Sequence, residues 1–99
     1  MGDEIATVRM PASLDTNSAG VTLDELDGAI NRGATKVVCD FSRTDYISSV
    51  GIGILMVAFK KLRKSGGELI LSALKPKVRS VLDITGLTKI IPIRETASL

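Results

Sequence analysis

Two adjacent serines, Ser48 and Ser49, occupy the position in this sequence that best suits chemistry. They follow a polar stretch, residues 42–46, and precede residues 50–59, which carry no charge. We expect a helix over residues 50–64, so both serines lie at its N-terminus, where backbone N–H groups lack partners and negative charge is favoured. Two interpretations stay open here: a serine at this place caps the helix, or it accepts a phosphate.

Other patterns that carry chemistry are absent from the sequence. The chain has no histidine, the commonest general base and metal ligand, and neither G-x-x-x-x-G-K-[ST] nor G-x-G-x-x-G is present. The single cysteine, Cys39, lies in an apolar run and is expected to be a buried core residue. We therefore predict no catalytic activity, no cofactor and no metal site.

The composition indicates one globular domain spanning residues 1–99. A hydrophobic fraction of 44% and a charged fraction of 24% are ordinary for such domains, and the net charge of +2 is too small to indicate a nucleic-acid partner. No apolar run approaches the roughly 18 residues of a membrane span, and no signal peptide follows Met1. We expect a cytoplasmic protein with neither nucleic acid nor membrane as a partner.

Hydrophobic periodicity predicts strands that alternate with helices. The first helix is predicted to begin at Thr22, with Glu25 at capping-box spacing, and to end before Gly33. The order β-α-β-α-β-α-β predicts an α/β domain with a mixed, mostly parallel four-stranded sheet, and residues 1–3 and 94–99 are expected to be flexible tails. Whether the helices cover one face of the sheet or both stays open. The predicted strands are residues 4–10, 36–41, 68–72 and 90–93, and the later helices are residues 50–64 and 75–85.

The helix after the serines is apolar on more than one side. Ile54 and Val57 lie away from its main apolar stripe, so we predict that both are exposed and contribute to partner binding. Gly51 and Gly53 permit close approach, either by a partner or by the loop around Leu14. The main stripe, expected to face the core, is Ile52, Leu55, Met56 and Phe59.

Three segments together resemble the STAS domains of bacterial anti-sigma-factor antagonists. They are D-F-S-x-x-x-x-I-S-S-V-G-I-G-I-L from Asp40, K-K-L-R-K-S-G-G-E-L-I-L from Lys60, and V-R-S-V-L-D-I-T-G-L from Val78. The S-L-D at Ser13 to Asp15 resembles the G-E-L-D loop of that family. The resemblance covers roughly residues 13–93.

The resemblance implies a phosphorylation switch. In that family the helix begins with D-S-[ST]-G-[LV]-G, and its first serine is phosphorylated by a partner that is both anti-sigma factor and ATP-dependent serine kinase. The unphosphorylated antagonist binds this partner and frees the sigma factor, and a PP2C-type phosphatase is a further possible partner. Carried onto this chain, the phosphoacceptor is Ser49, with Ser48 as second choice. The implied partner-binding residues are Asp15, Ser48, Ser49, Val50, Gly51, Ile52, Gly53, Ile54 and Val57.

This chain departs from the family pattern at two motif positions. Ser48 replaces the family's Asp, and Val50 replaces its second Ser or Thr. These departures keep an alternative open, namely a STAS module that is never phosphorylated and serves as a scaffold or as an accessory part of a transporter. Family members also have one further strand before residues 4–10, so we expect a sheet that is one strand short and has an edge that must be protected or paired.

Overall fold

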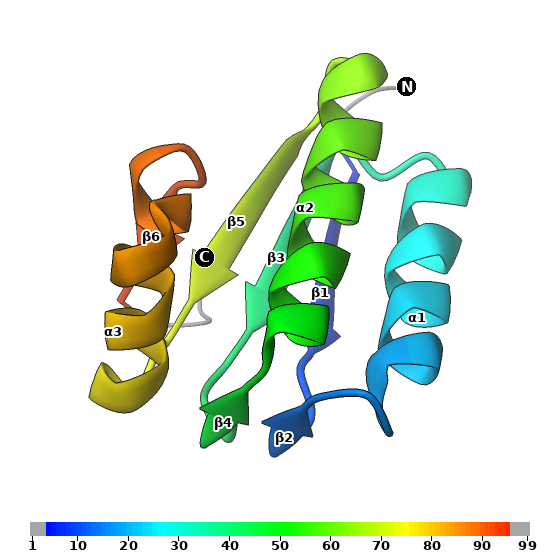
Figure 1. The fold of residues 1–99 in the computed structure, drawn as a ribbon. Coiled ribbons are helices and arrows are strands. Elements are labelled where there is room, and N and C mark those ends of the chain that lie inside the picture. Colours follow the sequence, from blue (N-terminus) through cyan, green and yellow to red (C-terminus); the bar gives the residue numbers. More distant parts are fainter. Residues whose placement is uncertain (1–3, 96–99) are drawn as a thin grey trace.

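The computed structural model describes residues 4–95, in which helices pack against a parallel sheet (Figure 1). The order of elements confirms the predicted alternation and adds two short strands and a 3-10 turn. The elements are β1 (Ile5–Arg9), β2 (Ser13–Leu14), α1 (Ala19–Asn31), β3 (Lys36–Asp40), β4 (Tyr46–Ile47), α2 (Ser49–Lys64), β5 (Glu68–Ser72), α3 (Pro76–Thr85), η1 (Leu87–Lys89) and β6 (Ile93–Arg94).

The sheet has the strand order β1-β3-β5-β6, and each of these pairings is parallel. One row of the register runs across all four strands through Val8, Cys39, Leu71 and Ile93. A separate parallel pair joins β2 to β4, with Leu14 opposite Ile47. The four-stranded α/β sheet was predicted from the sequence, whereas the two-stranded pair was not. Within the described residues β1 forms one edge of the sheet, as expected.

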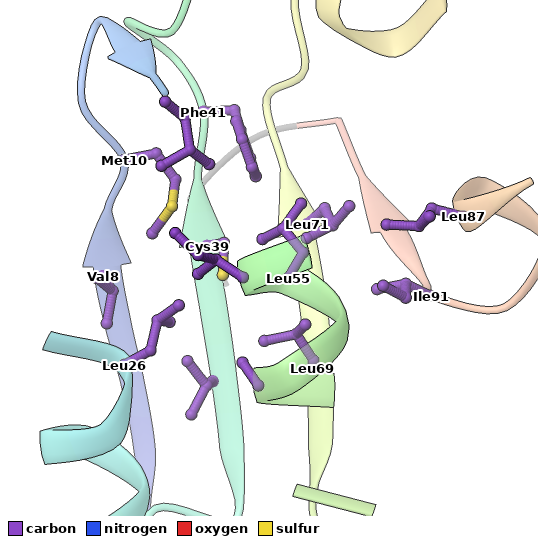
Figure 2. Packing of buried hydrophobic residues seen from close by; sticks show 14 of the residues in the cluster. Val8, Met10, Leu26, Cys39, Phe41, Leu55, Leu69, Leu71, Leu87 and Ile91 are labelled. Atoms are coloured by element: carbon purple, nitrogen blue, oxygen red, sulfur yellow. The ribbon is translucent and has the colours of Figure 1, made fainter. Parts of the chain in front are cut away.

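Apolar side chains of the sheet and helices meet in one core (Figure 2). Val8 and Met10, on one side of the first predicted strand, are buried. Strand β3 is buried on both faces, which is typical of an unbroken apolar run in a parallel sheet. Cys39 is fully buried, and its burial raises the pKa of the thiol to about 12. The thiol is therefore protonated at neutral pH, and the interpretation of Cys39 as a core residue is confirmed.

Helices α1 and α2 pack side by side and both contact the sheet; in Figure 1 α2 lies in front of the strands and α1 beside β1. An ion pair between Lys61 and Asp27, with Nζ 2.7 Å from Oδ1, joins α2 to α1. Helix α3 ends at Gly86, whose φ of +83° is the left-handed conformation that glycine adopts without strain. Pro76 occupies the first position of α3, where its missing N–H costs no hydrogen bond.

The predicted start of the first helix is wrong. Helix α1 begins at Ala19 rather than Thr22, and Thr22 is buried inside it instead of capping it. The reason is a turn ahead of the helix, in which the Asp15 carboxylate accepts hydrogen bonds from the backbone N–H groups of Asn17 (3.0 Å) and Ser18 (3.3 Å). This turn directs the chain into helical geometry one turn earlier than the capping-box pattern indicates.

The predicted last strand is displaced. Residues 87–89 form the turn η1, and the strand β6 covers Ile93–Arg94 rather than residues 90–93. Pro92 has no N–H to donate, but its carbonyl accepts from the Leu71 N–H at 2.9 Å, so regular pairing starts only beyond it. Strand β6 lies at the sheet edge, as the proline predicts.

Candidate functional site

The loop that carries the two serines is fastened to the segment after β1. The Thr44 hydroxyl donates to the Pro11 carbonyl at 2.7 Å, and the Asp45 N–H donates to the Ala12 carbonyl at 2.8 Å. The residues that form these bonds directly precede β2 and β4 in the sequence. The start of α2 is therefore held by two chain segments that lie more than 30 residues apart in the sequence.

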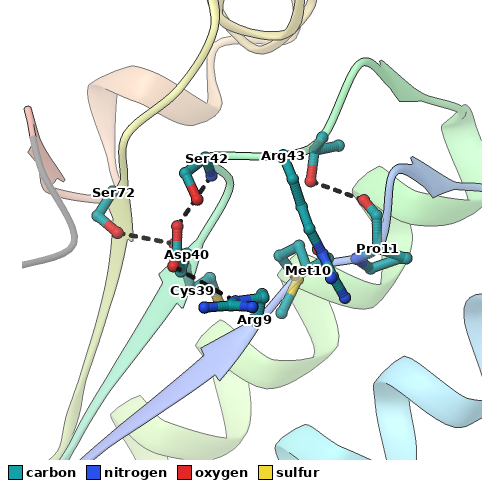
Figure 3. A network of polar contacts seen from close by, with 9 residues as sticks. Arg9, Met10, Pro11, Cys39, Asp40, Ser42, Arg43 and Ser72 are labelled. Carbon is teal, nitrogen blue, oxygen red and sulfur yellow. Dashed lines mark hydrogen bonds and ion pairs between the residues drawn. The ribbon is translucent and has the colours of Figure 1, made fainter.

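A buried carboxylate orders the beginning of the same loop (Figure 3). Asp40 is only 7% exposed, and its Oδ1 accepts from the Ser42 N–H at 2.9 Å while Arg9 Nε lies 4.0 Å from its Oδ2. The Ser72 hydroxyl donates to the neighbouring Cys39 carbonyl at 3.3 Å. Asp40 thus orders the start of the loop, and the chain leaves β3 in one fixed direction.

Ser48 is the N-cap of α2. Its backbone is extended (φ −100°, ψ 176°), and its hydroxyl accepts from the Gly51 N–H at 3.3 Å. The same hydroxyl donates to the Leu14 carbonyl at 3.4 Å, and the Ser48 N–H donates to that carbonyl at 3.0 Å. The Ser48 side chain is half-buried and engaged on both sides, which is the capping role.

Ser49 differs from its neighbour in each of these respects. It is the first residue of α2 and is exposed, and its hydroxyl makes no hydrogen bond to any other residue in the range 4–95. The backbone N–H groups of Ser49 and Val50 also have no acceptor among the residues that the structure describes. With the helix dipole, these two N–H groups form an environment that favours negative charge.

The two glycines of α2 have different surroundings. A Cβ on Gly51 would lie 2.6 Å from the Leu14 carbonyl oxygen and 2.9 Å from Cγ1 of Ile47, so this glycine serves close packing against the loop around Leu14. A Cβ on Gly53 would meet nothing within 4 Å, and this residue is exposed. Of the two alternatives left open by the sequence, internal packing holds for Gly51 and not for Gly53.

The prediction that Ile54 is exposed is wrong, because it is only 6% exposed and belongs to the core. Val57 is 41% exposed, as predicted, and Val50 is 42% exposed. The buried face of α2 is Gly51, Ile54, Leu55, Ala58 and Leu62, whereas Ile52, Met56 and Phe59 are only partly buried.

The buried face is rotated about a quarter turn from the predicted stripe, at 3.6 residues per turn. The cause is that Gly51 and Ala58, which are small, lie against the loop and the sheet, while larger residues occupy the flank. A search for large apolar residues along the helix does not detect a face made partly of small ones.

An exposed aromatic residue beside the serines was not singled out from the sequence. Tyr46 is 55% exposed and lies in β4, three residues before Ser49. Next to it, the Asp45 carboxylate accepts a hydrogen bond of 2.7 Å from Lys75 at the start of α3. This bond and the charge of Lys75, with a smaller effect of Lys77, lower the pKa of Asp45 below its ordinary value. The sequence did contain a signal for Tyr46, namely a large aromatic residue within an otherwise polar loop.

Asp15 lies at the other end of the β2 segment from this aromatic residue. Its carboxylate accepts hydrogen bonds within the turn before α1, so this residue, which the resemblance implies for partner binding, has a structural role in the loop. Of the predicted site residues, Ser48, Ser49 and Val50 lie together with Tyr46 at one end of the domain, next to the β2–β4 pair.

No helix within residues 4–95 has the length and apolar character needed to cross a membrane. Over the same part of the chain, no three or more metal-ligating His, Cys, Asp or Glu side chains gather into one group.

Comparison with known proteins shows the family. The STAS domain model matches residues 2–98. The Bordetella bronchiseptica protein BtrV, named as a candidate anti-sigma factor antagonist, is 43% identical over 77 residues, which are 75% of this chain and 66% of that protein. The anti-sigma-B factor antagonist of Bacillus subtilis is 34% identical over 86 residues, covering 87% of this chain and 78% of that protein.

A solved structure agrees with these sequence matches. The crystal structure of an anti-sigma factor antagonist from Mycobacterium paratuberculosis superimposes with a TM-score of 0.85 at 26% identity, over 98% of this chain and 82% of that one. This chain therefore belongs to the STAS domain family.

Proposed function

We propose that this chain is an anti-sigma-factor antagonist whose binding is switched by phosphorylation of Ser49. The unmodified protein binds an anti-sigma factor that has serine kinase activity and carries its own ATP, and phosphorylation releases the complex. A PP2C-type phosphatase returns the protein to its binding form. The names of the relatives support the antagonist role.

The observation that carries the choice of residue is the contrast between the two serines. The Ser48 hydroxyl is half-buried and makes two hydrogen bonds, to the Gly51 N–H and the Leu14 carbonyl. The exposed Ser49 hydroxyl makes none within the described part of the chain. A kinase can reach Ser49 without breaking any contact, whereas modification of Ser48 would remove the cap of α2.

The phosphoryl transfer needs no catalytic group from this chain. The Ser49 oxygen forms a bond to the γ-phosphorus of ATP, the bond from that phosphorus to the bridging oxygen breaks to leave ADP, and the hydroxyl proton passes to a base of the kinase. The phosphate adds roughly −1.5 to −2 charges at pH 7. The unpartnered N–H groups of Ser49 and Val50 and the α2 dipole accommodate this charge, so the fold stays intact.

The same charge disrupts a partner that covers the surroundings of Ser49. Val50, Gly53 and Val57 form the exposed side of α2 that follows Ser49, and two of the three are apolar. A partner surface that packs on these residues must be largely apolar, and a dianion at its border loses hydration without gaining a counter-charge. The domain therefore tolerates the phosphate and the complex does not.

The test compares four forms of the protein as bait: wild type, Ser49→Asp, Ser49→Ala and Ser48→Ala. We expect wild type and Ser49→Ala to retain the same ATP-binding protein, and Ser49→Asp to weaken binding by at least about tenfold, about 1.4 kcal/mol. We expect the folded fraction of Ser48→Ala to bind about as tightly as wild type. Mass spectrometry after incubation with ATP and the retained protein should place one phosphate on Ser49.

Two outcomes contradict the proposal in different ways. Phosphate found on Ser48 alone would show that the motif register is displaced by one residue. Equal binding by wild type, Ser49→Asp and phosphorylated protein would exclude the switch. The second outcome favours a scaffold in a larger assembly or an accessory part of a transporter, because Ser48 and Val50 depart from the family motif.

A further inference from the structure

A small groove lies between β4 and the first turns of α3, and the contacts described above do not use it. Its floor is formed by the buried side chains of Ile47 and Val78, and its walls by the exposed Tyr46 and the half-buried Val81. The groove holds about 220 Å³. This volume is below the roughly 300–1,000 Å³ typical of small-molecule sites, so it suits one or two protein side chains.

The groove is continuous with the surface around the phosphoacceptor. Tyr46 precedes Ser49 by three residues, which places their Cα atoms at most about 11 Å apart, and α3 packs directly beside β4. A protein that covers Ser49 and Val50 therefore reaches the mouth of the groove without extending its interface far. The cores of protein interfaces are enriched in aromatic residues, and the exposed Tyr46 supplies one between Ser49 and the groove.

The charges at the rim indicate the chemistry of the occupant. Asp45 is paired with Lys75, with Nζ 2.7 Å from Oδ1, so these two charges offset one another. Lys77 also lines the groove and forms no ion pair with the rest of residues 4–95. The rim consequently offers one uncompensated cation beside an apolar floor.

We propose that this groove receives an apolar side chain of the anti-sigma factor, and that an acidic residue of the same partner faces Lys77. The inference rests on the proposed function, since it assigns a second contact to the same partner. The groove would determine which anti-sigma factor is bound, because a pocket for one side chain discriminates between partners even where the switch serine is shared.

Tyr46 gives a direct test, because the chain has one tyrosine and no tryptophan. Protein labelled with 3-fluorotyrosine carries a single ¹⁹F reporter in the wall of the groove. The titrant is the anti-sigma factor that the wild-type bait retains and the Ser49→Asp bait does not. When it is added, we expect the ¹⁹F resonance of the unmodified protein to shift and broaden. The same titration of Ser49→Asp should leave the resonance in place over the concentration range in which the unmodified protein is already saturated, because the variant binds more weakly.

Two substitutions on α3 distinguish binding in the groove from binding elsewhere on the helix. Val81→Lys places a charge in the wall, whereas Ile84→Lys makes the same change at a residue that is 87% exposed and outside the groove. We expect Val81→Lys to weaken binding by at least about tenfold and Ile84→Lys to leave it within about twofold. Lys77→Glu should weaken binding at low salt, and the loss should shrink as salt rises. Melting curves of each variant test whether unfolding contributes to a loss of binding.

The outcomes distinguish this inference from the proposed function. If Ser49→Asp abolishes binding while the ¹⁹F resonance does not move and Val81→Lys binds as wild type does, the groove is unused and the switch stands. If no anti-sigma factor binds the unmodified chain, both proposals fail. A shift of the resonance together with unchanged binding by Lys77→Glu would retain the apolar contact and overturn the acidic one.

Discussion

Gly51 lies so close to Leu14 that a Cβ on residue 51 would be 2.6 Å from the Leu14 carbonyl oxygen. The same carbonyl accepts hydrogen bonds from the N–H and the hydroxyl of Ser48. One carbonyl of β2 therefore fixes the position of both the cap residue and the first turn of α2. The exposed position of Ser49 follows from this close approach.

The two glycines of α2 should respond in opposite directions to substitution by alanine. Gly51→Ala forces the helix away from Leu14 and Ile47, and we expect a loss of about 1–3 kcal/mol in the free energy of unfolding. Gly53→Ala meets nothing within 4 Å and replaces glycine in a helix, so it should stabilise the domain by about 0.5–1 kcal/mol. Urea unfolding measures both. Equal effects of the two changes would contradict the packing role of Gly51.

The capping role of Ser48 predicts a stability difference between the two serines. Ser48→Ala removes the acceptor of the Gly51 N–H and should cost about 1 kcal/mol. Ser49→Ala removes an exposed hydroxyl that has no hydrogen-bond partner within residues 4–95, and it should change stability by less than about 0.5 kcal/mol. Thermal unfolding of the two variants side by side makes the comparison. A larger loss for Ser49→Ala would reverse the assignment of cap and acceptor.

The rotated face of α2 predicts which aliphatic residues support the fold. Ile54→Ala creates a cavity in the core and should cost about 2–5 kcal/mol. Val57→Ala, on the exposed side of the same helix, should cost less than about 1 kcal/mol, since much of the side chain is already in contact with water. Denaturant midpoints measured under identical conditions decide the matter. Similar losses at both positions would show that α2 is covered on both sides.

Most of the fold could be predicted from sequence because its elements are long and strongly periodic. Alternating strands and helices, the buried strand β3 and the ends of α3 at Pro76 and Gly86 all follow from local patterns. The β2–β4 pair could not be predicted, because two residues in each strand carry no period and its partners are far apart in the chain. Its existence depends on Asp40 and Thr44, whose bonds form only in the folded loop.

The sequence predicted where in the chain the candidate site lies, but not which of its side chains are exposed. The position of Ser48 and Ser49 at a helix start follows from the sequence, yet the choice between them depends on where Leu14 lies. The face of α2 was misjudged because small residues are buried there, which hydrophobicity alone does not indicate. Tyr46 gains its importance from α3, which packs beside it from 30 residues further along the chain.

The last prediction concerns the ion pair at the rim of the groove. The hydrogen bond from Lys75, its charge and, less strongly, the charge of Lys77 lower the pKa of Asp45 in the folded protein. A carboxyl group whose folded pKa is below its unfolded value contributes stability above the unfolded pKa and loses it as pH falls through the folded one. Because the Asp45 side chain is exposed to solvent, this contribution to stability is small, and the pKa itself is the better measurement.

We expect NMR titration of the Asp45 carboxyl carbon to give a pKa below that of a free aspartate. Lys75→Met should raise it toward the ordinary value, because this change removes both the hydrogen bond and the nearer charge. Lys77→Met should raise it less, since Lys77 acts through its charge alone. If Lys77→Met had the larger effect, Lys77 rather than Lys75 would be the partner of Asp45. The uncompensated cation of the groove would then be Lys75, and an acidic residue of the partner protein would have to face the start of α3 instead of its first turn.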